Sequence, residues 1–205
     1  KGMQFGLWFE PEMISEDSEI YRQHPDFALH TPGRAKSYGR NQYVLDMSRL
    51  DVQDHIYHQM VAVIEQTGLN YIKWDMNRHL SEVYSSAFPY DQQGEIAHRY
   101  MLGVYALMSR ITSRYPEILF ESCAGGGGRF DLGILAYMPQ VWTSDNSDAV
   151  ARLKIQYGTS LMVPTNAMGA HVSAVPNHQT GRKTPLASRA AVAFYGAFGY
   201  ELDFT

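Results

Sequence analysis

Short apolar runs along the chain alternate with longer segments in which apolar residues recur at every third or fourth position. The short runs are rich in apolar and aromatic residues and close on polar ones, and they predict strands at 3–10, 69–75, 117–123 and 139–145. The longer segments predict amphipathic helices at 51–68, 94–116, 147–158 and about 185–197. Strands separated by helices indicate parallel βαβ units.

Other segments follow the rhythm less clearly. Prolines and glycines between residues 11 and 41 predict a long loop, in which a short strand is added at 42–48. Segments 159–169 and 198–204 are expected to repeat the strand pattern near the end of the sequence.

Two parallel architectures fit this order, an open doubly wound sheet and a closed (β/α) barrel. The glycine run 124–128 has neither the GxGxxG spacing of a dinucleotide site nor the GK[ST] of a phosphate loop, which speaks against the open sheet. Polar residues close strand after strand, and they are Glu10, Asp75, Cys123, Asp145, Asn166 and Asp203. A barrel brings all such ends to one mouth, so the α/β fold that we predict is a (β/α)8 TIM barrel.

The number of strands falls short of a complete barrel. Six strands end in such residues, whereas a closed (β/α)8 barrel has eight strands and takes about 250 residues. The chain is therefore expected to hold only about the last six strands, as one N-terminally truncated catalytic domain over residues 1–205.

Composition narrows the class of protein. The net charge of −4 and the scattered Lys and Arg residues give no support to a nucleic-acid surface. No segment approaches the roughly 18 apolar residues of a membrane span. The lone cysteine, Cys123, excludes an internal disulfide framework and fits a reducing compartment. We expect a cytoplasmic protein with no membrane partner.

Two strand ends carry the candidate chemistry. Side chains two apart on a strand point the same way, so Lys73 and Asp75 share one face, and Thr143 and Asp145 share another. Two aspartates facing one mouth, about 5–5.5 Å apart, are what a retaining glycosidase requires. Lys73 favours an ionised Asp75, which suits a nucleophile, whereas a neighbouring indole favours a protonated Asp145, which suits an acid.

Each feature also has a plain structural interpretation. Lys73 and Asp75 alone are better explained as a structural ion pair. Trp8 and Trp142 alone are more often core than sugar platforms, and Cys123 alone is a small buried hydrophobe. The glycine run could be only a flexible loop, although four glycines after a strand indicate backbone that approaches something closely. No HExxH spacing is present, so no metal site is expected.

Five motifs taken together resemble one enzyme family in order and spacing, over essentially all 205 residues. They are GLWFEPEM, YIKWDMNR, FESCAGGGGRFD, WTSDNSDA and VPTNAMGAHVS, and they are similar to the catalytic barrel of bacterial family 36 α-galactosidases. The resemblance implies that Asp75 is the nucleophile and Asp145 the acid/base. It further implies that the terminal galactose is held by Trp8, Arg40, Lys73, Asn77, Cys123, Gly125, Gly126 and Trp142.

The resemblance also implies the reaction. It is hydrolysis of terminal α-1,6-galactose from melibiose, raffinose and stachyose by double displacement, with no cofactor and no metal. Relatives of full length are commonly cytoplasmic homotetramers with further β domains. The alternatives are a related α-glycosidase or transglycosylase, such as a raffinose-synthase-like or α-N-acetylgalactosaminidase activity, and a non-catalytic sugar-binding barrel.

Overall fold

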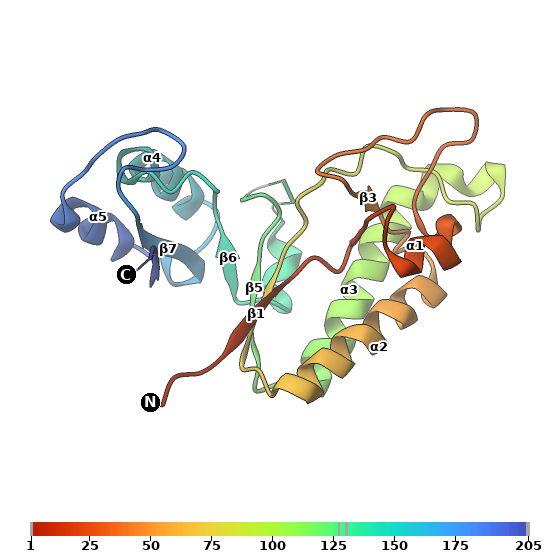
Figure 1. The fold of residues 1–205 in the computed structure, drawn as a ribbon, viewed down its shortest axis with the longest axis horizontal. Coiled ribbons are helices and arrows are strands. Elements are labelled where there is room, and N and C mark those ends of the chain that lie inside the picture. The colour runs from red at the N-terminus through yellow and green to blue at the C-terminus, as the bar shows by residue number, and fades with distance from the viewer. Residues whose placement is uncertain (1, 127, 130, 204–205) are drawn as a thin grey trace. The chain divides into compact units, whose positions relative to one another are not determined.

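The computed structural model describes residues 2–126, 128, 129 and 131–203 (Figure 1). The chain divides into two compact units, Lys1–Leu119 and Phe120–Thr205. Each unit is built of parallel strands and the helices that connect them. Gly127 of the glycine run and Phe204 of the last expected strand lie outside the described residues.

The first unit holds a parallel pair of strands. Strand β1 (Gly6–Phe9) pairs with β4 (Tyr71–Trp74), with Trp8 beside Lys73 and Phe9 beside Trp74. The ladder continues one residue further, because the N–H of Asp75 donates to the carbonyl of Phe9 at 2.8 Å. The alternation of side chains therefore extends through Asp75 and places it on the same side of the strand as Lys73.

Two long helices follow these strands and pack side by side (Figure 1). Helix α2 (Leu50–Thr67) and helix α3 (Ile96–Arg114) bury apolar faces, and each fully buried aliphatic side chain contributes about 1.5–3 kcal/mol. Helix α2 ends where predicted, on Gly68, whose left-handed φ of 61° suits a residue without a Cβ. Where α3 passes the residues that precede α2, a Cβ on Gly103 would lie 1.7 Å from the Met47 carbonyl oxygen.

The predicted long loop is more ordered than its sequence suggests. The short strand expected at 42–48 is confirmed as β3 (Tyr43–Val44), which pairs antiparallel with β2 (Met13–Ile14). A short helix, α1 (Glu19–Gln23), and a 3₁₀ turn, Pro25–Phe27, lie between them. These elements span two to five residues, which is too short for a periodic pattern to reveal.

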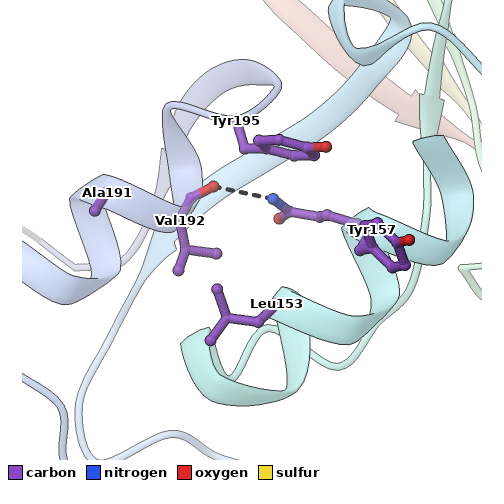
Figure 2. A pocket seen from close by; sticks show the side chains of 6 residues that line it. Leu153, Tyr157, Ala191, Val192 and Tyr195 are labelled. Carbon is purple, nitrogen blue, oxygen red and sulfur yellow. Dashed lines mark hydrogen bonds between the residues drawn. The ribbon is translucent and has the colours of Figure 1, made fainter.

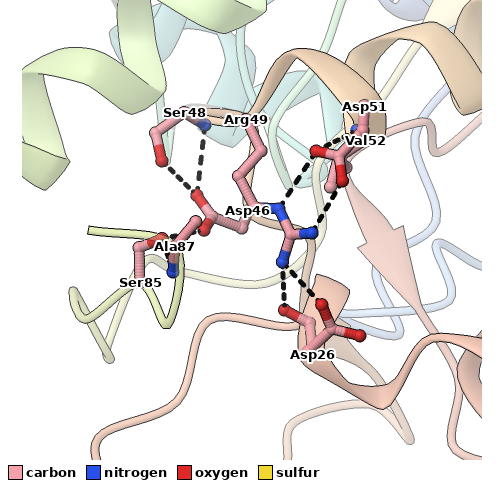
Figure 3. Close-up of polar contacts among 8 residues, drawn as sticks. All are labelled: Asp26, Asp46, Ser48, Arg49, Asp51, Val52, Ser85 and Ala87. Atoms are coloured by element: carbon pink, nitrogen blue, oxygen red, sulfur yellow. Dashed lines mark hydrogen bonds and ion pairs between the residues drawn. The ribbon is translucent and has the colours of Figure 1, made fainter.

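Polar contacts fix the segment before α2 (Figure 3). The Asp46 carboxylate is fully buried and accepts hydrogen bonds from the N–H and hydroxyl of Ser48 and from the hydroxyl of Ser85. Arg49 donates to the Asp26 carboxylate at 2.8 Å and to the Asp51 carboxylate at 2.7 Å. The long loop is thereby tied both to α2 and to the segment that follows β4.

The second unit continues the parallel pattern. Strand β5 (Leu119–Ser122) begins at the unit boundary and pairs with β6 (Gln140–Trp142), β6 pairs with β7 (Met168–Ser173), and β7 pairs with β8 (Ala197–Glu201), all in parallel. Helix α4 (Ala149–Ser160) connects β6 to β7, and helix α5 (Leu186–Ala193) connects β7 to β8. These are the βαβ units that the sequence predicts.

Two details of the predicted strands are wrong. Helix α4 extends to Ser160, and Asn166 lies in a 3₁₀ turn, Thr165–Ala167, so the strand runs from Met168 to Ser173 instead of ending near Asn166. Strand β6 ends at Trp142, so the strand alternation assumed for Thr143 and Asp145 does not apply. Small polar residues cause this early end, because their side chains bond the local backbone, as Ser144 does for the N–H of Asn146.

Helices α4 and α5, with Tyr195 just after α5, line an open apolar pocket of about 320 Å³ (Figure 2). Its lining includes the amide of Gln156, whose nitrogen donates to the Val192 carbonyl at 2.9 Å. The remaining lining is aliphatic or aromatic, so the pocket lacks the cluster of donors and acceptors that a sugar needs.

Among the described residues, no helix is long and apolar enough to cross a membrane.

Candidate active site

The Asp75 carboxylate lies directly after β4. Its side chain is buried and accepts hydrogen bonds from neighbouring residues. The Trp8 indole N–H donates to Oδ2 at 2.9 Å, the Asn77 amide donates to Oδ2 at 2.7 Å, and the N–H of Met76 donates to Oδ1 at 2.8 Å. These donors fix the orientation of the carboxylate.

Asn77 joins Asp75 to a second carboxylate. Its amide nitrogen also donates to Oε1 of Glu10 at 2.7 Å, and its backbone N–H donates to the same oxygen at 3.2 Å. Gln42 donates to the other Glu10 oxygen at 2.6 Å. Both amide hydrogens of Asn77 are therefore directed at carboxylates, which leaves its side-chain oxygen as the group that could face a sugar hydroxyl.

A buried carboxylate lies behind the strand end. Glu12 is fully buried and accepts from the Trp74 indole at 2.9 Å and from the Tyr100 hydroxyl at 2.5 Å. The Tyr100 hydroxyl also lies 3.9 Å from the sulfur of Met76. Glu12 thus anchors the residue before Asp75 directly and the residue after it through Tyr100.

The other predicted residues of this unit are placed as follows. Trp8 is 51% exposed, so it is not part of the core, and Lys73 is half-buried on β4. Arg40 is exposed at the tip of a two-residue turn closed by the antiparallel bridge between Gly39 and Gln42. Arg40 has a left-handed φ of 53°, a conformation that costs a residue with a Cβ roughly 1 kcal/mol or more.

Glu82 ties down the segment that leads to Arg40. Its carboxylate accepts from the N–H groups of Thr31 and Ser37 and lies 3.0 Å from Nδ1 of His30. Burial acts to raise the pKa of Glu82, but the two N–H groups and His30 outweigh it and hold the pKa below its usual value. The ionised carboxylate therefore fixes this loop.

In the second unit, Asp145 lies three residues after β6 and is exposed. The indole N–H of Trp142 donates to its Oδ1 at 3.1 Å. Trp142 is itself buried, with its ring 4.7 Å from that of His171 on β7. The tryptophan thus connects the exposed carboxylate to the interior of the unit.

The next aspartate, Asp148, has a different environment. It is buried, caps α4 by accepting from the N–H of Ala151, and forms an ion pair with Arg182. A carboxylate occupied in this way is explained by the helix end and the ion pair. Of the two, Asp145 is the carboxylate open to a ligand.

The glycine run approaches the Asp145 segment closely, as four glycines after a strand indicate. Gly125 and Gly126 have left-handed φ values of 58° and 80°. A Cβ on Gly126 would lie 2.4 Å from Cα of Ser144 and 2.5 Å from the backbone nitrogen of Asp145. Cys123, just before the run, is buried.

Among the described residues, no group of three or more His, Cys, Asp or Glu side chains could hold a metal ion.

The sequence analysis assigned no role to several residues of these hydrogen-bond networks. Glu10 and Glu12 lie within the motif GLWFEPEM, where only Trp8 is assigned a role, whereas Glu82 carries no motif spacing of its own. A signal existed for Glu12 alone, because a charged residue within the apolar stretch after a strand needs buried partners. The others depend on contacts between segments far apart in the chain.

The family model described as Melibiase matches residues 1–205. The α-galactosidase AgaA of Geobacillus stearothermophilus is 64% identical over 204 residues, which is all of this chain and 28% of that protein. The α-galactosidase Mel36A of Lactobacillus acidophilus is 57% identical over 205 residues, again 28% of its length. The chain thus spans less than a third of these relatives.

The crystal structure of AgaA, an α-galactosidase of glycoside hydrolase family 36, superposes on 99% of this chain with a TM-score of 0.97. Variants of AgaA have been solved in complex with raffinose and with stachyose. The predicted fold class, a (β/α) barrel represented by about its last six strands, is confirmed by this match.

Proposed function

Because the chain belongs to the Melibiase family, we propose that it carries the catalytic residues of a retaining α-galactosidase. The substrate is terminal α-1,6-linked galactose in melibiose- and raffinose-type oligosaccharides, the class found bound to AgaA variants. The observation that carries the proposal is the Asp75 carboxylate, which is buried at the end of β4 and aligned by Trp8, Asn77 and Met76.

In the first step Asp75 attacks the anomeric carbon of galactose, and the bond to the leaving oxygen breaks while Asp145 gives that oxygen its proton. In the second step Asp145, now ionised, takes a proton from water, and the water oxygen displaces Asp75 from the anomeric carbon. Two inversions give net retention. The donors around Asp75 support this role, since they hold the carboxylate in one orientation before attack.

We assign galactose binding to the predicted residues with one refinement. Trp8, Arg40, Lys73, Cys123, Gly125, Gly126 and Trp142 are proposed to contact the sugar. Asn77 acts mainly through Asp75, because both of its amide hydrogens point to carboxylates. No cofactor or metal takes part in the proposed steps, and residues 1–205 are proposed to act as one catalytic domain.

The experiment is a kinetic test of Asp75 in the complete protein. Wild type should hydrolyse melibiose and an aryl α-galactoside, and Asp75→Ala should abolish both activities. Sodium azide should restore release of the aryl group from the variant and form a galactosyl azide of inverted configuration. A variant that keeps its activity, or that azide does not rescue, would show that Asp75 is not the nucleophile.

The setting of the complete protein is also part of the proposal. We propose that it acts in the cytoplasm as a homo-oligomer, in line with the family resemblance and with a single, buried cysteine. Cell fractionation and light scattering of the purified complete protein test these two statements. Activity confined to the culture medium, or a monomeric mass, would contradict them.

A further inference from the structure

Arg152 lies in the first turn of α4, is only 3% exposed, and contacts residues 142–146 through its side chain. Its Nε donates to the Asn146 carbonyl at 2.9 Å, and its terminal nitrogens donate to the Thr143 hydroxyl at 2.6 Å and to the Ser144 carbonyl. The guanidinium carbon lies 4.3 Å from the centre of the Trp142 ring. The bonded carbonyls belong to the residues on either side of Asp145.

A buried cation of this kind is costly. Burial lowers the pKa of Arg152 to about 10, against the weaker raising effects of Glu201, Asp145 and Glu121. Within the described part of the chain Arg152 forms no ion pair with a carboxylate, and its charge is met by carbonyl and hydroxyl oxygens and an aromatic ring. A planar fork with several fixed donors holds three acceptors in one geometry, which a lysine cannot do.

The segment that Arg152 holds lies outside the strand ladder. Strand β6 ends at Trp142, so no ladder fixes Asp145, and its side chain is exposed. Trp142, which donates to Asp145, is also the ring against which the guanidinium packs. Arg152 therefore contacts the backbone on both sides of the carboxylate and the side chain that orients it.

We propose that Arg152 is a positioning residue for the general acid/base step: it fixes residues 142–146 so that the Asp145 carboxyl meets the glycosidic oxygen. This inference rests on the proposed function of Asp145. It assigns to Arg152 no contact with substrate. The loss of Arg152 should therefore act on proton donation and leave galactose binding largely intact.

Leaving groups separate this role from a purely structural one. Melibiose has a poor leaving group that must be protonated, whereas a dinitrophenyl α-galactoside needs little help from an acid. Arg152→Met in the complete protein should lower kcat/KM for melibiose about tenfold or more beyond any loss for the activated substrate. KM for melibiose should change little. Arg152→Lys should recover only part of the loss, because one ammonium cannot span the three acceptors.

Arg182→Met is the matched control. Arg182 also binds the start of α4 through its guanidinium, and its partner there is Asp148, which lies outside residues 142–146. Its removal should leave the ratio of the two kcat/KM values unchanged. If Arg152→Met does not fold, Thr143→Val removes a single acceptor of Arg152 and should shift the ratio in the same direction by a smaller factor.

Asp145→Asn separates failure of this inference from failure of the proposed function. The readout is the ratio of kcat/KM for the dinitrophenyl galactoside to kcat/KM for melibiose. If this ratio changes greatly in Asp145→Asn but not in folded Arg152→Met, Arg152→Lys or Thr143→Val, the role of Arg152 alone is overturned. An unchanged ratio in Asp145→Asn would overturn the acid/base assignment itself. A ratio that changes equally in the Arg182 and Arg152 variants would show a general effect of the start of α4 and would also overturn the inference.

Discussion

The side-chain amide of Asn77 donates to Oδ2 of Asp75 at 2.7 Å. The same nitrogen donates to Glu10 at the same distance, so one asparagine holds the proposed nucleophile against a fixed partner on the neighbouring strand end. Gln42, from the turn that carries Arg40, in turn holds Glu10. A chain of side-chain hydrogen bonds thus runs from the Arg40 turn to Asp75.

Replacement of Asn77 should act on turnover. In Asn77→Ala the Asp75 carboxylate loses a donor and can rotate, so kcat on melibiose should fall about 10²-fold with little change in KM. Glu10→Gln keeps an oxygen for Asn77 and should lose less. Gln66→Ala, on the exposed side of α2, is the control. A raised KM with unchanged kcat would show that Asn77 binds sugar directly, as the sequence alone predicts.

Substitution of Arg40 by glycine should stabilise the fold but weaken substrate binding. Arg40→Gly relieves a left-handed conformation, and after the greater chain entropy of glycine is subtracted the free energy of unfolding should rise by about 0.5 kcal/mol. The KM for melibiose should rise, because the guanidinium is lost. Asn41→Gly, with φ of 60°, should stabilise less, since asparagine tolerates this region, and should leave KM unchanged. Urea unfolding and steady-state kinetics measure both, and a destabilised Arg40→Gly would contradict the argument.

Substitution of Asp148 should affect stability, whereas substitution of Asp145 should affect catalysis. Asp148→Ala removes a helix cap and a partly exposed ion pair, so it should lower the free energy of unfolding by about 1–2 kcal/mol. It should not change the preference between poor and activated leaving groups. Asp145→Asn should show the reverse. If Asp148→Ala shows the leaving-group effect instead, the roles are interchanged.

The depressed pKa of Glu82 predicts a pH dependence of stability. A carboxyl whose pKa is lower in the folded state stabilises the fold above its ordinary pKa of 4.5, and the contribution disappears as pH falls through the lower, folded value. Wild type should therefore exceed Glu82→Gln in free energy of unfolding at pH 7, and the gap should close below pH 4.5. Glu95→Gln, whose partner Arg99 is exposed, is the control. A gap that stays constant with pH would exclude the ionised carboxylate as its cause.

The periodic pattern of apolar residues predicts the regular helices and strands, and it predicts their ends where a clear stop signal is present. It places β4 before Asp75 and α2 up to Gly68, because a buried strand and a capped helix each leave a regular signature. It fails at Thr143 and Asn166, where runs of small polar residues end a strand or form a 3₁₀ turn. At Thr143 the local conformation also depends on a tertiary partner, Arg152, which donates to its hydroxyl.

Some residues of the candidate site could be identified from the sequence, and others only from the structure. Asp75, Asp145 and Trp8 lie in motifs that are visible in the sequence itself, so they could be named as candidates before the structure was known. Glu82 and Arg152 act through other residues. Glu82 reaches Thr31 and Ser37 from a distant part of the chain, and Arg152 is an ordinary residue of an amphipathic helix until its contacts are seen. Positions of this kind can be found only after folding has brought segments together.

The close approach of Gly103 to Met47 has a mechanical consequence. Because the α3 backbone meets the Met47 carbonyl directly, a displacement of α3 by about one turn along its axis would bring the side chain of Tyr100 or Leu107, which share the face of Gly103, against that carbonyl. Shear between packed helices, one of the ways in which proteins close around ligands, is therefore blocked in this unit. Any adjustment of the first unit to a sugar must come from its loops, which Glu82 and Asp46 hold through a few polar contacts.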